Sequence, residues 1–142
     1  VPEKPGLHEF LSWLKEHSIK VAVATSTTRR VAEDYWKQSG IDQYIDASVC
    51  GDEVINSKPD PEIFLKAASL LKVPIAACIV AEDSINGLKA ARAAGAISCM
   101  IPDLTPYTKE LFPFCDYVSP SLLACKEILL QTPEADKLKS WK

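Results

Sequence analysis

Thr25 and Ser26 are the first residues along the chain whose types and position could do chemistry. They open a hydroxyl-rich stretch, TSTT, directly after the apolar run IKVAVA. Hydroxyl groups and backbone N–H groups at a strand-to-helix turn can hold a phosphate group. The same residues can also cap a helix without any ligand. By itself, this stretch leaves a phosphate site and a simple cap both open.

A second candidate is Lys58, which precedes Pro59 in the stretch SKPDPEIF. A lysine ammonium is a compact point charge that suits phosphate oxygens. Pro59 and Pro61 restrict the backbone of the loop that presents it. An ordinary surface lysine in front of a helix would fit the same letters. The residue therefore needs further support before a binding role can be assigned to it.

The third candidate is Glu82-Asp83-Ser84, at the end of another apolar run. Mg²⁺ takes oxygen ligands, keeps several waters and is commonly held by one or two carboxylates together with substrate phosphate. Adjacent acids that leave a buried strand would point into the ligand crevice of an α/β sheet. A capping acid beside a solvated one is the alternative interpretation.

Apolar spacing predicts the elements that would position these three stretches. Helical intervals between apolar residues predict helices, and short, almost wholly apolar runs predict buried parallel strands. Gly40 and Gly95 mark helix ends, and Ser84 is a candidate helix cap. The alternation indicates the α/β class with a mainly parallel sheet. Helices are expected over 6–17, 29–38, 60–71, 84–94 and 122–130, and strands over 19–24, 47–50, 77–81, 97–101 and 117–118.

Length and composition indicate one globular domain. The 142 residues are 47% hydrophobic and 25% charged, with a net charge of −3. We divide the chain into a core domain, 1–131, and a polar tail, 132–142, that we expect to fray. The sequence has no dense Lys/Arg cluster, no apolar run of membrane-spanning length and no signal-peptide pattern. We therefore expect neither a nucleic-acid partner nor a membrane partner.

Cysteine usage points to a cytoplasmic location. The chain has five cysteines, an odd number, and no CxxC pair. We interpret them as buried, reduced thiols. A catalytic cysteine would need a histidine partner, and the two histidines, His8 and His17, both fall in the first predicted helix. The cysteines are Cys50, Cys78, Cys99, Cys115 and Cys125.

Taken together and in this order, the three stretches resemble the haloacid dehalogenase superfamily in its beta-phosphoglucomutase-like branch. The matching segments are VAVATST, SKPDPEIFLKAA and VAEDSINGLKAARAAG. The resemblance extends from Pro5 to Leu122. It implies a doubly wound, mainly parallel sheet with helices on both faces. It also implies a Mg²⁺-dependent phosphatase or phosphomutase that acts on a small phosphorylated metabolite such as a sugar phosphate.

The resemblance also implies roles for individual residues. Thr25 would bind the transferring phosphoryl group, with help from the backbone N–H of Ser26. Lys58 would steady the phosphoryl oxygens and the nucleophile. Glu82 and Asp83 would hold the Mg²⁺ ion. Asp52 and Glu53 match a family stretch without a catalytic role, and Ala81 stands where this branch usually has a larger apolar residue.

The nucleophile of the family has no counterpart in this sequence. It is the first Asp of a DxD motif after the first strand, and the second Asp acts as general acid and base. No DxD occurs in the 142 residues. The first strand and the cap domain inserted after it are also missing. Because the covalent route then lacks its first step, we expect this chain to be inactive alone.

Two other α/β assignments fit less well. A receiver domain places its acids first and its lysine last, whereas the order here is Thr, Lys, acids. A dinucleotide-binding domain needs a glycine fingerprint after a strand, and the five glycines are scattered. A non-catalytic phosphate- or partner-binding module, derived from a family enzyme, stays open. We favour a fragment of an active enzyme, because the three motifs are intact.

The missing strand leads to a structural expectation. In the family it lies between the strands predicted at 19–24 and 77–81. Its absence would leave a gap of roughly 10 Å with two rows of unpaired backbone groups. We therefore expect one of three arrangements: a missing N-terminal segment supplied as a partner, a strand inserted from a neighbouring molecule, or direct pairing of the two flanking strands.

Overall fold

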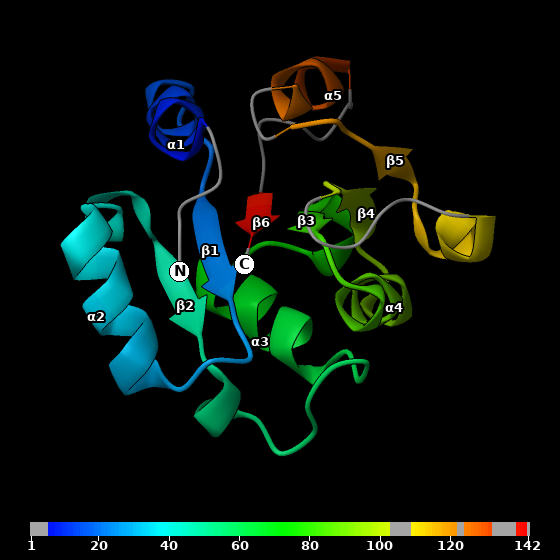
Figure 1. The fold of residues 1–142 in the computed structure, drawn as a ribbon, viewed down its shortest axis with the longest axis horizontal. Helices are drawn as coiled ribbons and strands as arrows, with labels where there is room; N and C mark the ends of the chain where they lie inside the picture. Colours follow the sequence, from blue (N-terminus) through cyan, green and yellow to red (C-terminus); the bar gives the residue numbers. More distant parts are fainter. Residues whose placement is uncertain (1–5, 103–108, 122–123, 132–138, 142) are drawn as a thin grey trace.

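A parallel sheet with strand order β2-β1-β6-β3-β4-β5 organises the protein (Figure 1). The computed structural model describes residues 6–102, 109–121, 124–131 and 139–141. The jump from β2 and β1 on one side to β3 and β4 on the other is the doubly wound arrangement. The strands are β1 (Val21–Ala24), β2 (Ala47–Val49), β3 (Ile79–Glu82), β4 (Ile97–Met100), β5 (Tyr117–Val118) and β6 (Lys139–Trp141).

Helices cover both faces of the sheet. Side chains of α1, α2 and α5 enter one buried cluster, and those of α3 and α4 enter the cluster on the opposite face. Figure 1 shows α1 and α5 on one side of the strands and α3 and α4 on the other. The helices are α1 (Leu7–Glu16), α2 (Arg29–Ser39), α3 (Glu62–Leu71), α4 (Ile85–Ala94) and α5 (Cys125–Gln131), with 3₁₀ turns η1 (Asp42–Tyr44), η2 (Gly51–Glu53), η3 (Ile75–Ala77) and η4 (Lys109–Phe114).

Strand β1 shows why an apolar run becomes a central strand. All four of its residues are buried. Val21 and Val23 pack into the cluster with α1 and α2, whereas Ala22 and Ala24 pack against α3. Because successive side chains point to opposite faces, a strand covered on both faces needs apolar residues at every position. The α/β class, the parallel sheet and the helices on both faces are thus confirmed.

Local signals placed most helix ends correctly. Gly40 and Gly95 terminate α2 and α4 with left-handed φ angles of 74° and 88°. Ser84 caps α4, accepting a hydrogen bond from the Gly87 N–H. Strand β1 begins two residues later than expected, at Val21. The last helix begins at Cys125 rather than at residue 122, and residues 122–123 lie outside the described part of the chain.

The polar tail corrects one expectation. Residues 139–141 do not fray: they form β6, which pairs in parallel with both β1 and β3. Ser140 lies opposite Ala22 on one side and Val80 on the other. The two flanking strands do not pair directly, because the chain's own C-terminal segment lies between them. The rest of the tail, 132–138 and 142, lies outside the described residues, and the domain boundary at 131 stays a prediction.

Within the described part of the chain, no helix is long and apolar enough to span a membrane.

Candidate phosphate and metal site

The ammonium of Lys58 connects the carboxyl ends of two strands that do not pair with each other. Its Nζ donates to the Ala24 carbonyl at the end of β1 (3.2 Å) and to Glu82 Oε2 at the end of β3 (3.0 Å). The Lys58 side chain is 8% exposed and the Glu82 side chain 0%. A buried charge is tolerated when it is paired and hydrogen-bonded, which is the case here. Two of the predicted site residues therefore meet in a buried ion pair.

The Glu82 carboxylate is held at both oxygens. Oε2 faces Lys58, and Oε1 accepts hydrogen bonds from the backbone N–H groups of Asp83 (3.0 Å) and Ser84 (3.4 Å). The Ser84 hydroxyl also donates to Oε1 (3.3 Å) and accepts from the Gly87 N–H (3.1 Å). The carboxylate is thereby fixed against the first turn of α4.

Gly87 makes this position of Glu82 possible. A Cβ atom at residue 87 would overlap Cγ, Cδ and Oε2 of Glu82. The side chain of Glu82 occupies the volume that any larger residue at 87 would need. Sequence reasoning missed this role, because Gly87 lies inside a helix where a glycine gives no turn signal.

The Thr25–Ser26 turn leaves the same edge of the sheet. The Thr25 N–H donates to the Val49 carbonyl (3.0 Å), which continues the pairing of β1 with β2. Thr25 Oγ1 accepts from the Thr27 N–H (3.2 Å). A Cβ at Gly51 would overlap the Ser26 carbonyl, so Gly51 allows the two loops to lie in contact. Thr25 thus follows directly on Ala24, whose carbonyl binds Lys58.

The loop that carries Lys58 is anchored by Glu62 in the first turn of α3. The Glu62 carboxylate accepts from the Ile55 N–H (2.9 Å) and the Asn56 N–H (3.0 Å). These hydrogen bonds, that from Asn56 first, lower the pKa of Glu62. The Lys58 ammonium also lies 5.1 Å from the centre of the Phe64 ring. Glu62 is the first residue of α3, where an acid is favourable at the positive end of the helix, so the sequence alone does not reveal its loop-anchoring role.

Asp52 and Glu53 are structural, as expected of loop residues. Arg29 makes two hydrogen bonds to Glu53, through Nε (2.7 Å) and Nη2 (2.8 Å), and its N–H donates to Asp52 Oδ1 (3.0 Å). The Arg29 guanidinium lowers the pKa of Glu53 to about 2, and Glu53 in turn raises the pKa of Arg29. These contacts hold η2 against the start of α2, the helix that follows the Thr25–Ser26 turn.

The predicted metal ligands lie together at the end of β3. Asp83 is half-buried and follows Glu82 directly. Within the described residues, no group of three or more His, Cys, Asp or Glu side chains could hold a metal ion. Two adjacent carboxylates suit Mg²⁺, which is commonly held by one or two carboxylates and keeps waters. Glu82 and Asp83 are therefore two adjacent carboxylates, and the described residues supply no third carboxylate, histidine or cysteine beside them.

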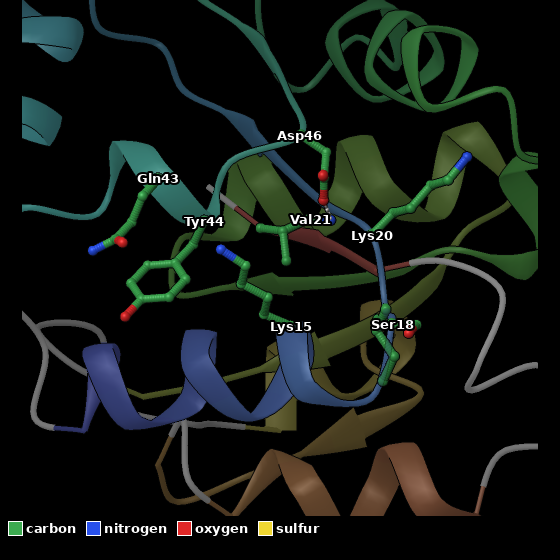
Figure 2. Close-up of a pocket in the computed structure, with 8 residues that line it drawn as sticks. Lys15, Ser18, Lys20, Val21, Gln43, Tyr44 and Asp46 are labelled. Atoms are coloured by element: carbon green, nitrogen blue, oxygen red, sulfur yellow. Dashed lines mark hydrogen bonds between the residues drawn. The ribbon is translucent and has the colours of Figure 1, made fainter.

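A separate hollow lies at the opposite, amino end of β1. Figure 2 shows its lining side chains, which come from α1, the turn before β2 and the start of β1. The volume of the hollow is about 190 Å³. Its polar groups have structural partners: Asp46 accepts from the Val21 N–H (2.7 Å), and Lys20 donates to the Leu71 carbonyl (2.9 Å). Since Thr25 lies at the other end of the strand, this hollow does not belong to the candidate phosphate site.

Comparison with known proteins identifies the family. The sequence model of the haloacid dehalogenase-like hydrolases matches residues 1–95. The chain is 43% identical over 93 residues to the Phosphorylated carbohydrates phosphatase of Thermotoga maritima, covering 66% of this chain and 43% of that protein. The chain therefore belongs to the haloacid dehalogenase-like hydrolases.

Solved structures place it in the branch that includes beta-phosphoglucomutase. CbbY from Rhodobacter sphaeroides in complex with phosphate superposes with a TM-score of 0.77 at 30% identity, covering 86% of this chain and 55% of that one. Beta-phosphoglucomutase from Clostridium difficile gives a TM-score of 0.77 at 25% identity, covering 94% of this chain and 56% of that one. The chain thus spans roughly half the length of the relatives that it matches.

Proposed function

We propose that this chain forms the core of a Mg²⁺-dependent phosphoryl-transfer enzyme, a phosphatase or phosphomutase. The observation that carries the proposal is the buried Lys58 ammonium, which bridges the ends of β1 and β3. Phosphoryl transfer depends mostly on positioning and on stabilising charge at the phosphoryl oxygens. A buried cation beside a hydroxyl-bearing turn and a pair of carboxylates supplies both requirements.

Each site residue has a proposed role. The Thr25 hydroxyl and the Ser26 N–H bind the phosphoryl group, and Lys58 neutralises its charge. Glu82 and Asp83 hold Mg²⁺, which would supply further charge stabilisation at the phosphoryl oxygens. Glu82 also positions Lys58, to which it is paired in this structure. Gly87 and Glu62 act indirectly, by fixing the carboxylate of Glu82 and the loop of Lys58.

The attacking carboxylate must come from another segment. A strand in the central position of this sheet runs parallel to β1 and β3, so its carboxyl end emerges at the edge where Lys58 lies. The present occupant, Lys139-Ser140-Trp141, contains no carboxylate side chain. We therefore propose that this chain alone is inactive and that a DxD-bearing strand completes the enzyme.

The substrate class follows from the relatives. The Thermotoga relative is named for phosphorylated carbohydrates, and the Rhodobacter structure holds phosphate. We propose a small phosphorylated metabolite, such as a sugar phosphate, as the substrate.

A non-catalytic binding module is the second candidate function. It is favoured by one observation: β6 completes the sheet without any further segment. In that case the site at Thr25 and Lys58 would bind a phosphate group or a phosphorylated partner without catalysing phosphoryl transfer. The absence of a carboxylate in β6 is consistent with this alternative.

Phosphate binding tests the site that both functions share. Titration calorimetry with inorganic phosphate, with and without Mg²⁺, should show binding that Lys58→Met abolishes. Lys20→Met is the matched control, because Lys20 likewise donates to a backbone carbonyl but lies at the opposite end of β1. Equal affinity in all three proteins would refute the site.

Turnover separates the two functions. Fusion of a DxD-bearing amino-terminal segment from a family enzyme to this chain should produce Mg²⁺-dependent hydrolysis of a sugar phosphate. In that fusion, Lys58→Ala should cost about 3–4 kcal/mol of transition-state stabilisation, the typical loss for one preorganised charge-stabilising group. A folded fusion that binds phosphate without turnover would favour the binding module.

A further inference from the structure

Two cysteine thiols meet in the core between the sheet and the last helix. Cys99 Sγ, in the middle of β4, lies 4.0 Å from Cys125 Sγ, the first residue of α5. Both belong to the buried cluster that α1 shares with α5, and they are 1% and 5% exposed. Figure 1 shows α5 on the same side of the sheet as α1, so the thiol pair joins the peripheral helix to a strand.

The separation of the sulfur atoms is close to what a covalent bond requires. A disulfide has an S–S length of about 2.05 Å, so the sulfurs need to approach by roughly 2 Å. The bond would therefore require side-chain rotation together with a shift of α5. The chain between the two cysteines contains η4 and β5, which the bond would close into one loop.

The two thiols also differ in acidity. The hydrogen bond between the two thiols lowers the pKa of Cys125; burial opposes this effect and Ser119 adds to it. The same interaction with Cys125, together with burial, raises the pKa of Cys99. While the two thiols are in contact, Cys125 is therefore the more acidic of the pair.

An oxidant could reach the thiols where the short elements β5 and α5 lie at the edge of the protein. Strand β5 has two residues and terminates the sheet, and α5 has seven. Leu130 on α5 is 65% exposed. Short peripheral elements open locally at lower free energy than a central sheet, so local opening of α5 would give an oxidant access to both thiols. When α5 closes again, the two sulfurs return to contact.

We propose that Cys99 and Cys125 form a redox-active dithiol that a hydroperoxide converts into a disulfide. The Cys125 thiolate attacks one peroxide oxygen and becomes a sulfenic acid, releasing hydroxide. The Cys99 sulfur then displaces the hydroxyl group of the sulfenic acid as the S–S bond forms. Overall, two thiols and one hydrogen peroxide give one disulfide and two waters. The product ties α5 to β4, and thiol reductants reverse it.

Peptide mapping after oxidation tests the proposal. Reduced protein is treated with hydrogen peroxide, free thiols are alkylated, and the digest is analysed by mass spectrometry. The expected product is lighter by two hydrogens before alkylation and contains one linked peptide pair, Cys99 with Cys125. Cys99→Ser and Cys125→Ser should abolish the link. Cys78→Ala is the matched control and should retain it, because the buried Cys78 thiol contacts the Pro74 carbonyl rather than Cys125.

Wild-type protein gives a second test that needs no variant. The Cys99–Cys125 link should form faster in native buffer than in urea, where the five cysteines should pair more evenly. Oxidation should also slow hydrogen exchange in α5 and raise the thermal midpoint. A different dominant pair, equal rates in urea, or oxidation of Cys115 alone would overturn the proposal, as would unchanged exchange in α5.

Discussion

Gly87→Ala tests whether the volume beside Glu82 governs the stability of the site. Gly87 is the third residue of α4, where alanine is intrinsically the better helix former. Helix propensity alone predicts that the substitution stabilises the protein by about 1 kcal/mol. The structure predicts the opposite sign, because the new methyl group would overlap the buried Glu82 side chain.

The expected magnitude combines three effects. Overpacking a buried position costs about 1–3 kcal/mol. Moving the Glu82 carboxylate away also separates it from Lys58, and breaking a buried ion pair costs about 3–5 kcal/mol. Because partial relaxation reduces both costs, and the helix gains about 1 kcal/mol, we expect a net loss of about 2–4 kcal/mol.

Urea denaturation of a double-mutant cycle is the appropriate assay. In a Glu82→Ala background the overlap disappears, so Gly87→Ala should stabilise by about 1 kcal/mol. Gly95→Ala is the control, because a Cβ there meets nothing within 4 Å and acts only through its φ of 88°. Its cost, about 1–2 kcal/mol, should be the same in both backgrounds. A stabilising Gly87→Ala in the wild-type background would refute the reasoning.

Three further predictions concern the charge network, the central strand and the metal. The pKa of Glu53 falls from 4.5 to about 2 on folding. The contribution of Glu53 to stability is therefore complete above pH 4.5 and is lost as the pH falls through about 2. Between these two pH values, the urea midpoint of Glu53→Gln should depend less on pH than the midpoint of the wild type. Ser140→Pro removes a backbone donor from the strand between β1 and β3 and should cost about 1–3 kcal/mol in urea denaturation, whereas an unchanged midpoint would mean that β6 contributes no stability. Mg²⁺ should bind weakly to this chain and more weakly to Asp83→Asn in calorimetry; equal heats would place the metal elsewhere.

The candidate site was partly predictable because its residues follow local signals. An apolar strand followed by hydroxyls, a lysine before a helix start and two acids after a buried strand can each be recognised within a few residues. Parallel strands bring their carboxyl ends to one edge of the sheet, so the meeting of these stretches could also be expected. The pairing of Lys58 with Glu82, 24 residues apart, could not, since it depends on how two loops fold back over that edge.

Helix ends and buried strands were determined by the sequence itself. Gly40 and Gly95 adopt backbone angles that other residues rarely take, and β1 is apolar on both faces, so the residue types alone explain these elements. The residue types of Lys139-Ser140-Trp141 do not predict a central strand. Only the tertiary structure decided its place: β1 and β3 present unpaired backbone groups on either side of one position, and β6 satisfies both rows.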